Sequence, residues 1–125
     1  MISKGDYMGD YKKHLNLAKE KLESINEAFK EKRYTVVGDL GTKVVEQLVE
    51  ADAAKISQHF GDHRARHEYA NANYPDEITH AMRRIWFAYG DLGYDGVNGG
   101  RAREVMENLE IVVRFFEGRF GEKIG

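Results

Sequence analysis

Apolar residues recur at spacings of three and four along most of this 125-residue chain, and this period restricts the fold more than any other feature of the sequence. Such spacing places apolar side chains on one face of an α-helix. No segment alternates with the period of two that is typical of a half-buried strand. A chain of this length buries roughly two-thirds of its extended surface, which suits one core. We therefore expect an all-α fold with one helical domain over residues 1–125.

The periodic segments predict four helices joined by short or glycine-rich connections. They cover about 11–31, 36–60, 75–92 and 99–120. Thr35, Gly61 and Asn98 are the expected caps at the start of the second helix, its end and the start of the last. The single proline, Pro75, stands where the third helix begins. Because short connections make antiparallel neighbours, the pattern predicts a four-helix up-down bundle.

The second predicted helix has apolar or small residues over much of its circumference, which indicates a central helix or one that faces both the core and a partner. Gly38 and Gly41 each cost about 1 kcal/mol of helix propensity relative to alanine, so a close approach of helices is their expected use. Trp86, with Phe87 and Tyr89, is expected in the core or on a dimer surface rather than as a ligand platform. These features predict a homodimer.

Composition excludes several function classes. The absence of cysteine excludes disulfides, a thiol nucleophile and zinc sites of the cysteine type. A net charge of −2 argues against wholesale coating of nucleic acid but leaves room for a local basic patch. The longest uncharged apolar run, Ile85 to Tyr89, is far too short for a membrane span, and no signal-peptide pattern occurs. We expect a cytoplasmic protein without a membrane segment, and no cofactor motif is found.

Residues 62–74 interrupt the apolar pattern and are predicted to form a long connection of the kind that often carries function. This segment and the third helix supply the candidate contacts to a nucleotide or to RNA: His63, Arg64, Arg66, His67, Arg83 and Arg84. Tyr69 and Tyr74 are near enough in sequence to add stacking rings. Interleaved acidic residues dilute this charge, so the alternative is a solvated loop, salt-bridged to itself or to a partner subunit.

A metal site is the second hypothesis. His59, His63 and His67 are spaced by four, so on a continuous helix their rings would line one side and could share one ion. Gly61 lies between the first two and favours a helix end there, which would separate the rings. Solvated or hydrogen-bonded loop histidines are the alternative.

Four segments of the chain resemble the HEPN family, the "higher eukaryotes and prokaryotes nucleotide-binding" helical domains. They are the hairpin Glu31-Lys-Arg-Tyr-Thr35, the small-residue-rich helix Gly38 to Val49, the histidine-bearing loop after it, and the turn Gly93-Tyr94-Asp-Gly-Val97. The resemblance implies a dimeric bundle of four or five helices. Many such proteins are ribonucleases, often the toxin paired with a small nucleotidyltransferase-like antitoxin, and use Arg followed four to six residues later by His.

That motif is absent from this chain, because none of its five histidines follows an arginine at the required spacing. The turn Leu92-Gly93-Tyr94 stands where the family has His-Gly-Tyr, so leucine replaces the histidine. The resemblance therefore implies a non-catalytic module that binds nucleotide or RNA or has a regulatory role of the toxin–antitoxin type. The alternatives are the metal-binding bundle and a purely structural homo-oligomeric protein.

Overall fold

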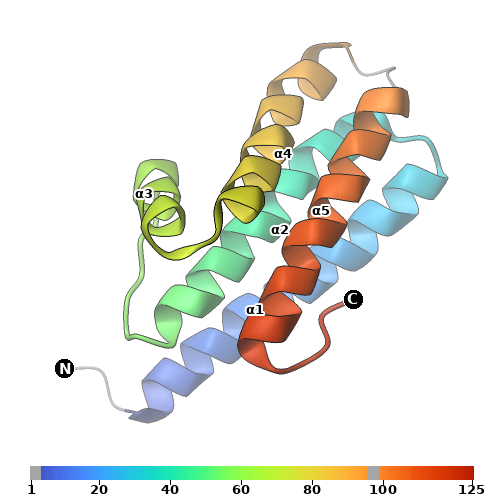
Figure 1. Cartoon of the computed structure of the whole chain (residues 1–125). Coiled ribbons are helices and arrows are strands. Elements are labelled where there is room, and N and C mark those ends of the chain that lie inside the picture. The colour runs from blue at the N-terminus through green and yellow to red at the C-terminus, as the bar shows by residue number, and fades with distance from the viewer. Residues whose placement is uncertain (1–3, 96–98) are drawn as a thin grey trace.

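The computed structural model describes residues 4–95 and 99–125, and the side chains of residues 10–89 and 99–125. The described residues are helical throughout apart from short connections, and none forms a strand, which confirms the all-α prediction. The helices are α1 (Lys4–Lys30), α2 (Tyr34–Ala54), α3 (His63–Asn73), α4 (Asp76–Asp95) and α5 (Gly99–Phe120) (Figure 1). The prediction of four helices is wrong, because the segment expected to be a loop forms α3.

Helix α2 is the central element of the fold. It packs against α1, α4 and α5, and the short α3 lies against α2 and α4 (Figure 1). Val37, Val44 and Leu48 of α2 are completely buried, as the wide apolar face predicted. The apolar stripes of α1 and α5 are likewise buried against it, from Leu15 to Ile25 and from Ala102 to Phe116.

Gly41 marks the closest approach of α2 to its neighbours. A Cβ atom at this position would lie 2.9 Å from Val105 Cγ1 on α5 and 3.2 Å from Ile85 Cγ2 on α4. Both distances are shorter than ordinary van der Waals contact, so α2 can sit this close only without a side chain here. The predicted use of Gly41 is confirmed.

The first connection is a tight turn at residues 31–33, where Arg33 N–H donates to the Ala28 carbonyl at 2.8 Å and Lys32 has a φ of 60°. Helix α2 begins at Tyr34, and the residue before it, Arg33, makes no side-chain cap. The prediction of Thr35 as the N-cap is wrong because Thr35 already lies inside the helix. Burial of α2 compensates for the missing cap.

Helix α2 ends at Ala54, well before the predicted end at Phe60. The next residues tighten into hydrogen bonds to the third residue back, and Ser57 has a φ of 58°, which stops the helix. Gly61 also has a positive φ, of 74°, but it lies in the connection rather than at the helix end. The predicted cap is therefore wrong, although the glycine does supply the left-handed conformation expected of it.

Helix α3 has clear start and stop signals that the polar sequence conceals. The Asp62 carboxylate accepts a hydrogen bond from Ala65 N–H at 2.8 Å and caps the first turn. Tyr74 is extended because it precedes Pro75, and this ends the helix. Helix α4 then begins directly after Pro75, as predicted, with Asp76 and Glu77 in its first turn.

Helix α4 continues to Asp95, so the predicted turn from Gly90 to Gly100 is wrong at its start. Glycine weakens a helix without forbidding it. The predicted cap at Asn98 lies outside the described residues. Among the described helices, none combines the length and the apolar composition needed to cross a membrane.

Candidate functional site

The side chain of Arg66 joins α3, the helix on which it lies, to α2. Its Nε donates to Glu50 Oε2 at 2.9 Å, and its Nη1 donates to Glu46 Oε2. The Arg66 side chain is only 15% exposed. This placement does not support the predicted role of Arg66 as a contact to RNA, because its Nε and Nη1 atoms already bond two carboxylates.

Glu50 is a buried carboxylate that holds the chain around residue 60. It accepts hydrogen bonds from Phe60 N–H at 3.0 Å and Gly61 N–H at 2.9 Å. Burial raises the pKa of Glu50, but the hydrogen bonds from these two amides and from Arg66, together with the nearby His59, outweigh burial and leave the pKa below its usual value. Glu50 therefore remains ionised as the anchor of the α2–α3 connection.

Asp52, two residues after Glu50 on α2, forms a second anchor. It accepts hydrogen bonds from Tyr69 Oη at 3.1 Å, from Tyr74 Oη at 2.7 Å and from Arg119 Nε of α5 at 2.8 Å. Burial and the Asp52 charge raise the pKa of Tyr74 well above its usual value. Tyr74 is buried, so the two tyrosines act as structural links rather than as stacking rings for a ligand.

His63 and His67 both lie against Trp86 of α4. Their ring centroids are 4.5 Å and 5.1 Å from the tryptophan, in edge-to-face arrangements. His63 Nδ1 also lies 3.4 Å from Glu46 Oε2. Burial, with the neighbouring charge of His63, lowers the pKa of His67. The two histidines therefore fix the tryptophan ring at the α3–α4 junction.

His59 lies apart from these two histidines. Its ring stacks on His14 of α1, with centroids 5.8 Å apart, and its Nδ1 lies 3.4 Å from Glu50 Oε1. The residues expected to share a metal ion, His59, His63 and His67, thus have different neighbours. In the part of the chain that the structure describes, no group of three or more His, Cys, Asp or Glu side chains is arranged to hold a metal ion.

The remaining predicted contacts lie on the surface. Arg64 is largely exposed and pairs with Glu68 at 3.0 Å. Arg84 Nε donates to His80 Nε2 at 3.1 Å. Arg83 is exposed and lines a small pocket together with His67. The structure therefore brings His63 and His67 together at Trp86, with Arg83 beside His67, while Arg84 bonds His80 and Arg66 bonds Glu46 and Glu50.

A pocket of about 460 Å³ opens beside Trp86 and is lined by residues of α1, α2, α3 and α4. Its lining residues are Lys21, Asp39, Thr42, Lys43, Glu46, Gln47, His63, Trp86 and Tyr89. Among these residues, only His63 was predicted from the sequence to contact a ligand. The others come from α1, α2 and α4, and most of them are polar or charged residues of the kind found on a solvated helix face. Only the packing of the helices brings these residues together, and no local sequence pattern indicates it.

The pocket combines aromatic rings with unpaired charges. Trp86 and Tyr89 are nearly parallel, with an interplanar angle of 21° and centroids 6.4 Å apart, and Tyr89 is 46% exposed. Lys21 and Lys43 form no ion pair with any described side chain. Thr42 is buried in the same wall, and its hydroxyl has no hydrogen-bond partner among the described residues. Such a site is equipped for a flat, anionic ligand.

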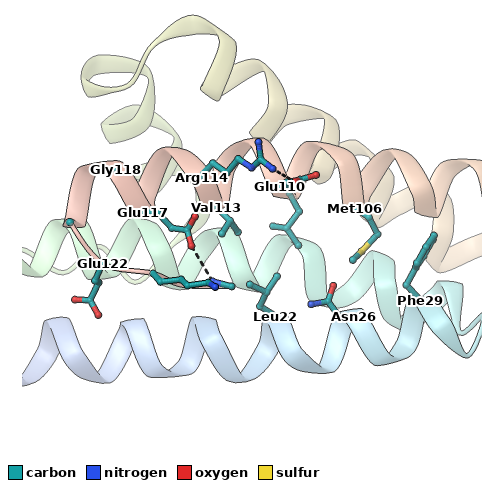
Figure 2. A pocket seen from close by; sticks show the side chains of 14 residues that line it. Leu22, Asn26, Phe29, Met106, Glu110, Val113, Arg114, Glu117, Gly118 and Glu122 are labelled. Carbon is teal, nitrogen blue, oxygen red and sulfur yellow. Dashed lines mark hydrogen bonds and ion pairs between the residues drawn. The ribbon is translucent and has the colours of Figure 1, made fainter.

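A larger groove of about 940 Å³ lies between α1 and α5 (Figure 2). Its walls are mainly apolar, with Leu22 on α1 facing Val113 on α5. Among its charged groups, Arg114 bonds Glu110 at 2.7 Å, and the Glu117 carboxylate accepts the amide of residue 124 at 2.8 Å. We place the candidate site in the smaller pocket, because its two lysines form no ion pair with any described side chain and lie beside the nearly parallel rings of Trp86 and Tyr89.

Comparison of the chain with protein-family models, with curated proteins and with solved structures finds no match. The side chains of Leu92 and Tyr94, on which part of the resemblance to HEPN domains depends, lie outside the described residues.

Proposed function

We propose that this protein is a non-catalytic module that binds a nucleotide or single-stranded RNA in the pocket beside Trp86. In this proposal α1, α2, α4 and α5 form a HEPN-like up-down bundle, and α3 is an added helix that shapes the pocket. The module acts in the cytoplasm as a homodimer with a regulatory role of the toxin–antitoxin type. A small nucleotidyltransferase-like protein is the proposed partner.

The observation that carries the proposal is that two aromatic rings lie in the same pocket as two lysines that form no ion pair with a described side chain. Tyr89 and Trp86 offer parallel faces on which a base can stack, an interaction worth about 1–3 kcal/mol per base. Lys21 and Lys43 offer ammonium groups to a phosphate without first having to break an ion pair. The pocket volume of about 460 Å³ lies in the range typical of small-ligand sites.

Two observations favour binding without catalysis. The chain lacks an arginine at the spacing from a histidine that the resembled ribonucleases use. The histidine that lines the pocket, His63, contacts Glu46 and Trp86, and Arg66, which bonds the same Glu46, also bonds Glu50. Arg66 is therefore not available to hold a scissile phosphate beside His63.

Exposed apolar side chains support the proposed dimer. Phe87 on α4 is 64% exposed and Ile111 on α5 is 47% exposed, and a dimer contact over these helices would cover them. Light scattering of the purified protein tests this part. A mass of one chain at micromolar concentration would contradict it.

Trp86 is the only tryptophan, so its fluorescence reports directly on the pocket. We expect a short single-stranded RNA to quench this fluorescence, and the double variant Lys21→Gln/Lys43→Gln to weaken binding at least tenfold at low salt. The matched control is Lys12→Gln/Lys30→Gln, which removes the same charge from α1 outside the pocket. Equal binding by both double variants would overturn the proposed site.

A further inference from the structure

Two carboxylates line the pocket, and Asp39 is the one that forms no ion pair with a described side chain. The other, Glu46, pairs with Arg66 and His63. Asp39 lines the pocket without a hydrogen bond or ion pair to any described side chain. An acidic group in a pocket with two lysines would weaken the binding of a simple anion, so its presence indicates a ligand that also carries hydrogen-bond donors.

Asp39 and Lys43 stand four residues apart on α2, so they are neighbours on one face of the helix, with Cβ atoms about 5–6 Å apart. This spacing often produces an ion pair, yet no ion pair links them here. The pocket wall therefore presents a hydrogen-bond acceptor and a donor side by side, both open to a ligand.

Among the four RNA bases, guanine matches this pair best. Its edge offers two adjacent N–H donors, at N1 and N2, followed by the acceptors O6 and N7. A carboxylate can accept both N–H groups, while an ammonium group donates to O6. Uracil places its single N–H between two carbonyl oxygens that repel a carboxylate, and adenine and cytosine offer one amine beside an acceptor.

We propose that the pocket selects a guanine nucleotide, with Asp39 binding N1–H and N2–H and Lys43 binding O6. The base stacks on Tyr89 beside Trp86, and Lys21 binds the phosphate. This inference rests on the proposed function, and it adds the identity of the base and makes Asp39 the residue that determines specificity.

The test is titration of Trp86 fluorescence with GMP, AMP and UMP at equal ionic strength. We expect GMP to bind at least tenfold more tightly than the other two. Asp39→Asn keeps the shape of the side chain but loses an acceptor, so it should weaken GMP binding about tenfold and leave AMP binding unchanged. Glu107→Gln, an exposed change on α5 outside the pocket, is the matched control and should bind all three as the wild type does.

The outcomes separate the two proposals. Equal affinity for the three nucleotides, or an unchanged GMP affinity in Asp39→Asn, would overturn guanine selection while leaving nucleotide binding in place. If neither the nucleotides nor single-stranded RNA binds, both proposals fall. A second arm compares GMP with RNA trinucleotides that have guanosine or uridine at the centre. Preference for the guanosine trinucleotide without binding of GMP identifies RNA as the source of the base, and Asp39→Asn should then remove that preference.

Discussion

The guanidinium of Arg66 donates to Glu50 at 2.9 Å, and the Glu50 side chain is only 2% exposed. The same guanidinium reaches Glu46, one helix turn earlier on α2. A residue that the sequence marks as a contact to RNA is therefore the main electrostatic link between α2 and α3. Its loss would leave a buried carboxylate without its principal countercharge, which is costly in a protein interior.

Replacement of Arg66 by methionine is expected to lower the free energy of unfolding by about 3 kcal/mol, because Glu50 remains buried and loses its countercharge. Urea denaturation followed by circular dichroism measures the change. Arg64→Met is the matched control, since the Arg64–Glu68 pair is exposed, and should change stability by less than about 0.5 kcal/mol. If the two variants lose similar amounts of unfolding free energy, the Arg66 bridge stabilises the protein no more than the exposed Arg64–Glu68 pair does.

The Glu50 carboxylate should make stability depend on pH. Its pKa is lowered in the folded state, so its contribution is fully present above the ordinary value of 4.5 and is lost as the pH falls through the folded-state pKa. The wild type should therefore be more stable than Glu50→Gln at pH 7, and the gap should narrow on acidification below about pH 4.5. Unfolding in urea at pH 7 and at pH 3.5 measures both gaps. Glu110→Gln, an exposed control, should show no comparable gap at either pH.

Gly41→Ala is expected to destabilise the protein by about 1–3 kcal/mol, since the new methyl group would lie 2.9 Å from Val105 and force α2 away from α5. Gly118→Ala is the matched control, because a Cβ there meets nothing within 4 Å and alanine favours the helix. The control should gain up to about 1 kcal/mol. Thermal melts of both variants measure the difference, and a neutral Gly41→Ala would contradict the close helix contact.

The salt dependence of RNA binding should identify which lysines contact phosphate. For single strands the slope of log K against log salt changes by about 0.7 for each phosphate contact. Lys21→Gln is expected to reduce the slope by about that amount, because Lys21 lines the pocket and forms no ion pair with the side chains that the structure describes. Lys12→Gln, on the same helix outside the pocket, should leave the slope unchanged. A slope equal to that of the wild type in Lys21→Gln would remove this lysine from the site.

Apolar spacing predicted the long helices well because burial of one face stabilises each of them. The stripe from Tyr11 through Leu15 to Ile25 is buried as predicted. Helix α3 escaped prediction because its sequence is polar and only Ala70 is buried. It is stabilised by the Asp62 cap and by bonds to carboxylates on α2, which leave no periodic signal in the sequence.

The candidate site could be predicted only in part. His63 was identified from the density of charge around it, and it does line the pocket. Lys21 and Asp39 come from different helices, 18 positions apart, and only the packing of α1 on α2 brings them to one pocket. Trp86 was expected in the core or at a dimer surface, yet it is partly exposed at the pocket wall. Tertiary packing, which no local pattern encodes, determines this assembly.

Because α3 is attached through ionised and hydrogen-bonded side chains rather than through an apolar face, its opening costs less than unfolding of the whole chain. Its backbone amides should exchange with deuterated solvent sooner than those at the centre of α2. A protease that cleaves near the exposed Arg64 should likewise act before the remaining helices come apart. The wall formed by His63 should thus detach and reattach as a unit, and added salt should change that exchange little, because the Arg66–Glu50 link is buried.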